Sequence, residues 1–158
     1  KLIGLMNKFG ATFLPKNKSN FPLTLISSEI PIGIEYKSIG YIHNKKILNQ
    51  AYSAADIFVA SSIEDAWPKT FAEAMYCGTP VVCFDNTSIA EIIDHKINGY
   101  VVKNFDANEL KDGIEWISHE IEKENYKKSK TRVKVMEFDS KFIAKKYIEL
   151  YKNTLNIY

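Results

Sequence analysis

Three carboxylates gather around one turn of the sequence SSIEDAWPKTFAEAMYCGTPVV, which spans residues 61–82. Glu64 and Asp65 come just before a Trp-Pro step, and Glu73 follows inside a short helical pattern. A carboxylate accepts two hydroxyl hydrogen bonds at once, which suits the diol of a ribose or the ring of a sugar. The alternative is a solvated loop and a capped helix, in which Asp65 is the N-cap and Glu73 lies on the helix surface.

The same turn has the features of an anion site. Pro68 is well suited to the first position of a helix, so the next backbone N–H groups would point out of the helix N-terminus. Those N–H groups belong to Lys69, Thr70 and Phe71. Together with the positive end of the helix dipole they favour an anion, typically a phosphate, and the Lys69 side chain either adds a charge or is an ordinary exposed lysine. Phosphate and hydroxyl recognition together indicate a nucleotide diphosphate sugar.

Trp67 and the three histidines are further candidates. Trp67 is able to stack on a base or a sugar, although a tryptophan beside a proline is more often a packing residue. His43, His95 and His119 form no Ser-His-Asp or metal-binding constellation that the spacing supports. We expect His95 and His119 to lie on the surface, keep His43 as a candidate contact of the nucleotide, and expect no metal ligands.

Two helix-strand units must position these residues. An apolar stripe predicts a helix over NKKILNQAYSAAD (44–56), which leads into DIFVASS (56–62), a run typical of a parallel strand covered on both faces. A second helix, from about Lys69 to Cys77, ends at Gly78 in a left-handed cap. In an open parallel sheet, ligands bind beyond the carboxyl ends of the strands, and residues 63–69 lie there.

The remaining pattern completes an α/β fold, with a parallel sheet wound with helices on both faces. Short strands are expected at 11–15, 23–27, 36–42, 80–84 and 99–102, and a turn at Asn98-Gly99. Residues 88–94 predict a short helix, with Ser88 and Glu91 as a capping box.

The segment from Asp106 onward predicts helices that pack on the same domain. An aromatic stripe near its end is most simply core; it consists of Phe142, Ile143, Tyr147, Leu150 and Tyr151. The basic run KKSKTRVK (127–134) invites a nucleic-acid or membrane interpretation, but a solvated helical face is favoured because acids lie just upstream.

The composition supports one globular domain. The 158 residues are 46% apolar and 25% charged, and the net charge of +2 gives no independent indication of a nucleic-acid partner. No apolar run approaches the roughly 20 residues of a membrane span, and no signal peptide is visible. The two cysteines, Cys77 and Cys83, predict reduced core thiols, which fits a cytoplasmic protein.

These linked motifs resemble a known family. The segment SSIEDAWPKTFAEAMYCGTPVV, with LNQAYSAADIFVA before it and IAEIIDHKINGYVV after it, is similar to the C-terminal, donor-binding half of retaining GT-B glycosyltransferases of the group 1, family 4 type. The family hallmark is a pair of acids separated by seven residues, and Asp65 and Glu73 stand at that spacing. The family usually has Glu where Asp65 stands, and Glu64 is a second candidate for that role.

The resemblance implies a role for each motif residue. Glu73 would hold the ribose hydroxyls, and Asp65 would face the hydroxyls of the donor sugar. The backbone of residues 67–71 would hold the diphosphate, and the loop that contains His43 would lie near the nucleobase. Such enzymes need no metal ion, since the helix dipole and basic residues neutralise the leaving diphosphate.

The resemblance also implies a longer enzyme. Because Lys1 stands inside a helical pattern, we expect the chain to be a piece of a larger protein whose N-terminal, acceptor-binding domain is missing. That protein would transfer a hexosyl unit to a glycan or lipid-linked acceptor in polysaccharide biosynthesis, in the cytoplasm or at the inner face of the membrane. The alternatives are a nucleotide-sugar epimerase or hydrolase, and a non-catalytic α/β binding module.

Overall fold

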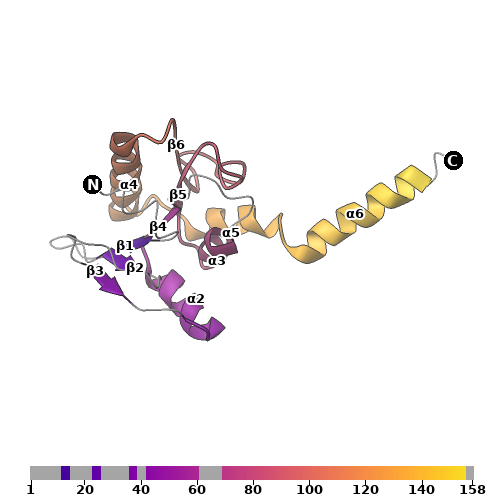
Figure 1. The fold of residues 1–158 in the computed structure, drawn as a ribbon, viewed down its shortest axis with the longest axis horizontal. Helices are drawn as coiled ribbons and strands as arrows, with labels where there is room; N and C mark the ends of the chain where they lie inside the picture. Colours follow the sequence, from indigo (N-terminus) through magenta and orange to yellow (C-terminus); the bar gives the residue numbers. More distant parts are fainter. Residues whose placement is uncertain (1–11, 15–22, 26–35, 39–41, 61–68, 156–158) are drawn as a thin grey trace.

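A mixed β-sheet forms the centre of the protein (Figure 1). The structure, a computed structural model, describes residues 12–14, 23–25, 36–38, 42–60 and 69–155. Within these ranges six strands pair in the order β3-β2-β1-β4-β5-β6. Their bounds are Thr12–Leu14 (β1), Leu23–Leu25 (β2), Tyr36–Ser38 (β3), Ile57–Ala60 (β4), Val81–Phe84 (β5) and Gly99–Val102 (β6).

The predicted parallel sheet is confirmed for β4, β5 and β6. Phe58 pairs with Val81 and Val82 pairs with Tyr100, both in parallel register. By contrast, β1 runs antiparallel to β4 and to β2, whereas β2 and β3 are again parallel. This reversal was not predicted, because the direction of a three-residue strand is set by its connections and leaves no trace in its own side-chain pattern.

Five helices are described, and four of them, α2 to α5, pack around the parallel half of the sheet. Their bounds are Lys45–Ala54 (α2), Lys69–Tyr76 (α3), Ala107–Glu122 (α4), Lys128–Met136 (α5) and Ser140–Leu155 (α6). Asn44 caps α2 by accepting hydrogen bonds from the backbone N–H groups of Lys46 and Ile47, and Asp106 caps α4 through the N–H of Asn108. The helices predicted over 44–56 and from Lys69 are therefore confirmed.

Both faces of the parallel strands are buried under helices, as predicted. On one face, Phe58, Val81 and Cys83 pack in a cluster with residues of α2, α3 and α5. On the other face, Ile57 and Val82 pack against residues of α4. Because alternate strand residues point to opposite faces, a fully apolar strand can serve both clusters at once.

Gly78 ends α3 in the predicted left-handed conformation, with φ of 83°. Its N–H donates to the carbonyl of Met75 and the N–H of Thr79 donates to that of Ala74, which is the Schellman pattern. A Cβ atom at this position would stand 2.9 Å from the Cβ of Lys128 on α5. A glycine is therefore required both by the backbone and by the neighbouring helix.

The helix predicted over 88–94 is wrong. The chain there forms successive tight turns, in which Ala90 N–H donates to the carbonyl of Thr87 and Ile92 N–H donates to that of Ile89. The Thr87 hydroxyl donates to the carbonyl of Phe84 at 2.8 Å, so the turn is fastened to the end of β5 before a helix can develop. A side chain that bonds to nearby backbone competes in this way with helix formation.

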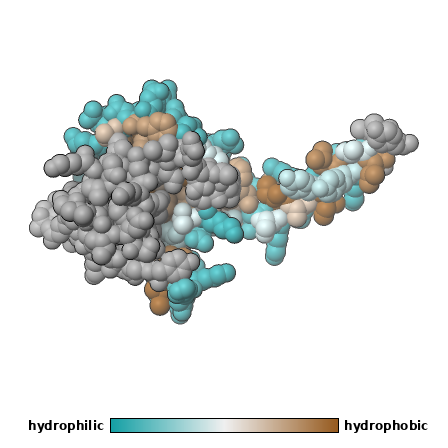
Figure 2. Space-filling model, viewed as in Figure 1, coloured by the Kyte–Doolittle hydropathy of each residue, from teal (hydrophilic) through white to brown (hydrophobic). Residues whose placement is uncertain are grey.

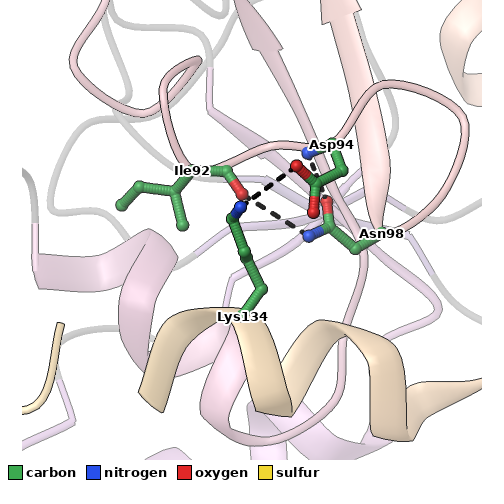
Figure 3. Close-up of polar contacts among 4 residues, drawn as sticks. All are labelled: Ile92, Asp94, Asn98 and Lys134. Atoms are coloured by element: carbon green, nitrogen blue, oxygen red, sulfur yellow. Dashed lines mark hydrogen bonds and ion pairs between the residues drawn. The ribbon is translucent and has the colours of Figure 1, made fainter. Parts of the chain in front are cut away.

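The loop after these turns is held by one buried amide (Figure 3). Asn98 is 1% exposed; its Oδ1 accepts the N–H of Asp94 and its Nδ2 donates to the carbonyl of Ile92. Lys134 of α5 forms an ion pair with Asp94 at 3.1 Å. The predicted Asn98-Gly99 turn into β6 is thus confirmed, and it is joined to α5.

Helix α6 projects away from the rest of the domain (Figure 1). It has no buried residue, and its aromatic stripe is open to solvent, with Tyr147 at 54% and Tyr151 at 60% exposed. Apolar side chains are visible along it in Figure 2. The prediction that this stripe belongs to the core is therefore wrong: a helical periodicity shows that one face is apolar but does not identify its partner.

Candidate functional site

The candidate site lies where β4 ends and α3 begins. The last residue of β4 is Ala60, and the next described residue, Lys69, is the first of α3. The intervening residues 61–68 lie outside the described part of the chain. The predictions for Glu64, Asp65, Trp67 and Pro68 fall there.

Three predicted ligand contacts lie at the described start of α3, and they differ in their exposure to solvent. Lys69 and Thr70 are exposed, whereas Phe71 is 0% exposed and belongs to the core cluster under α2 and α5. The Phe71 side chain therefore anchors the helix. Only its backbone N–H remains a candidate for contact with an anion.

Glu73 is held by a tyrosine from the neighbouring helix. It lies near the middle of α3, partly buried, and its Oε2 accepts a hydrogen bond from the hydroxyl of Tyr52 at 3.2 Å. Tyr52 is 2% exposed and lies near the end of α2. Glu73 is therefore a half-buried residue of α3 with a hydrogen-bond partner on α2, and its role in ligand binding stays a prediction.

Tyr52 was not predicted as part of the site. Burial, followed by the nearby Glu73 carboxylate, raises the pKa of Tyr52 well above its usual value, so its hydroxyl remains a donor. Its backbone carbonyl accepts the hydroxyl of the buried Thr79 at 2.6 Å. The sequence signal for this contact was a tyrosine within the apolar stripe of a helix. A buried phenol usually has a hydrogen-bond partner, so the stripe implied a polar group near Tyr52.

The two helices that carry Tyr52 and Glu73 are both contacted by α5. Arg132 donates to the carbonyl of Cys77, just past the end of α3, at 3.1 Å. Lys128 donates to the carbonyl of Ser53 near the end of α2 at 3.5 Å. Cations at helix C-termini satisfy free carbonyls and complement the dipole. The basic run 127–134 is therefore more than a solvated face, because it contacts its own domain.

His43 lies at the opposite end of α2 from Tyr52. It is exposed and comes immediately before the N-cap Asn44. At a helical rise of about 1.5 Å per residue, the start of α2 lies about 10 Å from Tyr52 along the helix axis. The two residues therefore mark two ends of one helix.

His95 is exposed, as predicted, but it has a structural role. Its Nδ1 accepts the backbone N–H of Val101 at 3.1 Å, and its ring lies 4.4 Å from that of Tyr100. Partial burial, followed by the nearby Lys96, lowers the pKa of His95. The fold therefore favours the neutral imidazole.

This contact predicts a loss of stability in mild acid. Because the folded pKa of His95 lies below its ordinary value, the unfolded chain binds the proton more readily. The stabilisation is complete above the ordinary histidine pKa of about 6.5, and it is lost as the pH falls through the folded pKa. The measurement is the free energy of unfolding from urea denaturation at pH 7 and pH 5. Between these pH values it should fall less in His95→Asn, which keeps an acceptor at the δ position, than in the His119→Asn control. An equal fall in the two variants would contradict the prediction.

Both cysteines, Cys77 and Cys83, are free thiols, as expected, and burial raises the pKa of Cys83 to about 12. Among the described residues, no three His, Cys, Asp or Glu side chains gather as a metal-binding group. None of the described helices is long and apolar enough to pass through a bilayer.

Two relatives of known sequence resemble this chain. An N,N'-diacetylbacillosaminyl-diphospho-undecaprenol alpha-1,3-N-acetylgalactosaminyltransferase of Campylobacter jejuni is 25% identical over 158 residues, covering 96% of the chain. An uncharacterized glycosyltransferase of Methanocaldococcus jannaschii is 27% identical over 77% of the chain. The chain spans 42% of the first relative and 32% of the second.

Solved structures share the fold. Sucrose-phosphate synthase from Thermosynechococcus elongatus superimposes with a TM-score of 0.70, at 21% identity, over 99% of this chain and 42% of its own. An Anabaena protein, HepE in complex with UDP, superimposes with a TM-score of 0.64, at 22% identity, over 75% of this chain and 32% of its own. The architecture is the α/β, Rossmann-like fold of GT-B glycosyltransferases.

The family itself follows from the sequence match. The family described as "Glycosyl transferases group 1" matches residues 9–134, which is most of the chain and includes β4, α3, β5 and β6. This chain belongs to the group 1 glycosyltransferases.

Proposed function

We propose that this chain is the donor-binding domain of a retaining glycosyltransferase, and that it binds a nucleotide diphosphate sugar at the start of α3. The observation that carries the proposal is the Tyr52–Glu73 hydrogen bond. It holds a carboxylate on α3, the helix that follows the carboxyl end of β4, and ligands of open α/β sheets bind beyond that end of the strands. Two neighbours with the same fold were solved with UDP, and a third with ADP.

Each part of the ligand has a candidate partner. Glu73 accepts hydrogen bonds from the ribose hydroxyls, and Asp65, or Glu64 beside it, accepts them from the donor sugar. The N-terminal N–H groups of α3 and the exposed Lys69 neutralise the diphosphate, so that no metal ion is required. Trp67 and His43 remain candidate contacts of the sugar and the base.

The reaction would belong to the whole protein. An acceptor hydroxyl attacks the anomeric carbon as the bond to the diphosphate breaks, and the leaving phosphate takes the hydroxyl proton on the same face. The sugar would then keep its anomeric configuration. Since the Campylobacter relative is named for an undecaprenol-linked acceptor, we infer a glycan or lipid-linked acceptor in polysaccharide biosynthesis. It would be bound by an N-terminal domain, in the cytoplasm or at the membrane's inner face.

Titration of the chain with UDP, GDP, ADP and their sugars by calorimetry tests the proposal. One nucleotide series should bind saturably, with and without EDTA. If none of them binds at millimolar concentration to the folded chain, the proposed function fails. Formation of an isomeric nucleotide sugar without an acceptor would instead indicate an epimerase.

A further inference from the structure

The fold brings a second polar side chain to the candidate ligand site. Tyr52 lies 21 residues before Glu73, on a different helix, and their side chains form a hydrogen bond of 3.2 Å. The ring of Tyr52 packs in the core, 6.0 Å from the ring of Phe58. A ring without a hydroxyl would make the same contact, so packing alone does not explain the hydroxyl group.

We propose that Tyr52 is the positioning residue of Glu73, and that it aims the carboxylate at the ribose of the bound nucleotide. This inference rests on the proposed function. Within the described part of the chain, the hydroxyl of Tyr52 donates to Oε2 of Glu73, and the proposal assigns the other carboxylate oxygen and the second lone pair of Oε2 to the ligand. A carboxylate that is held from the protein side loses less conformational freedom when a diol binds.

Tyr52 is itself fixed at both ends. Its side chain is 2% exposed, and its backbone carbonyl accepts the hydroxyl of Thr79 at 2.6 Å. Thr79 follows Gly78 in the cap of α3, and its N–H donates to the carbonyl of Ala74. Tyr52 therefore joins the end of α2 to the cap of α3 and to the Glu73 carboxylate. A hydroxyl in such a position cannot turn to another partner without movement of the core.

The buried phenol of Tyr52 remains a hydrogen-bond donor. Burial raises the pKa of Tyr52, which prevents the phenol from giving up its proton near neutral pH. The hydroxyl of Tyr52 therefore continues to donate to Glu73, whose carboxylate has further lone pairs for two ribose hydroxyls.

The test compares a nucleotide with its deoxyribose analogue. Tyr52→Phe removes only the hydroxyl, and we expect it to weaken binding of the nucleoside diphosphate by about 3- to 10-fold. Binding of the 2′-deoxy and 3′-deoxy analogues should change less. The preference for the ribonucleotide should therefore decrease, which a general loss of packing would not produce.

Tyr76→Phe is the matched control. Tyr76 lies on α3, the helix that carries Glu73, and its hydroxyl donates to the carbonyl of Val135, so Tyr76→Phe also removes one phenol oxygen but not the contact with Glu73. The ribose preference should be unchanged in this variant. In a Glu73→Gln background, Tyr52→Phe should have no further effect on the preference.

The outcomes separate the two proposals. If Glu73→Gln decreases the ribose preference and Tyr52→Phe does not, the positioning role is overturned and the proposed function stands. If Tyr52→Phe lowers the affinities for ribose and deoxyribose nucleotides equally, its role is structural only and the inference is also overturned. If the folded chain binds no nucleotide, both proposals fail.

Discussion

Glu73→Gln should weaken binding of the nucleoside diphosphate by about 10- to 100-fold, while the chain remains folded. Hydrogen bonds to a charged group contribute about 1.5–3 kcal/mol, and the glutamine keeps the shape of the side chain but not its charge. The amide oxygen can still accept the hydroxyl of Tyr52, so the contact between α2 and α3 survives. Calorimetric titration with UDP, GDP and ADP measures the change in affinity.

Glu115→Gln is the control for the loss of one negative charge. Glu115 lies on α4, on the other face of the sheet, where it pairs only with Lys111 among the measured ion pairs of the described residues. Its substitution should leave nucleotide affinity unchanged. If Glu73→Gln behaves like Glu115→Gln in a chain that binds nucleotide, Glu73 does not contact the ribose.

Gly99→Ala should destabilise the chain by about 3 kcal/mol, within the range of overpacked core positions. A Cβ at Gly99 would lie 2.3 Å from the carbonyl oxygen of Val81 and 3.0 Å from a methyl carbon of Ile93. Gly99 pairs with Val81 where β6 joins β5, and β5 is fully buried between two strands. The added methyl group therefore clashes with a backbone carbonyl of a buried strand, and pairing on both sides prevents this strand from moving away. Urea denaturation measures the loss.

Gly113→Ala provides a graded comparison. A Cβ there would approach the ring of Tyr100 at 2.6 Å, but a side-chain ring is able to turn. Alanine in a helix is also favoured over glycine by about 1 kcal/mol, which offsets part of the clash. Gly113→Ala should thus cost less than Gly99→Ala. A larger loss of unfolding free energy in Gly113→Ala than in Gly99→Ala would show that the paired strands β5 and β6 can move apart to accept the added methyl group.

Much of the parallel half of the fold was predictable from local pattern. Helix α2 has an apolar stripe and an asparagine cap, and β4 is a short, wholly apolar run. Gly78 marked a helix end that only a glycine can adopt without strain. Each of these signals is contained within a few residues, and so a single sequence reveals it.

The errors share a different origin. The direction of β1, the turn at 88–92 and the exposed face of α6 all depend on what lies next to them in space. Thr87, for example, binds back to β5 and prevents the helix that its neighbours favour. Apolar periodicity carries no information about such partners.

The candidate site shows the same limit of local pattern. Glu73 was named as a candidate from its spacing to Asp65 and from the motif around it, and its role stays a prediction. Its hydrogen-bond partner is on another helix, 21 residues earlier, and no local pattern links the two. The long-range contact is what distinguishes a held carboxylate from a solvated one.

The contact of Arg132 with the end of α3 has a consequence for the electrostatic potential at the other end. Helix α3 has 8 residues, so its two poles are separated by only about 12 Å. At that distance the negative pole cancels part of the attraction that an anion feels at the positive one. Arg132 places a positive charge 3.1 Å from the carbonyl oxygen of Cys77 and offsets that pole. The field at Lys69 is therefore stronger than so short a helix would produce alone, and α5 contributes to anion attraction from the far side of the helix.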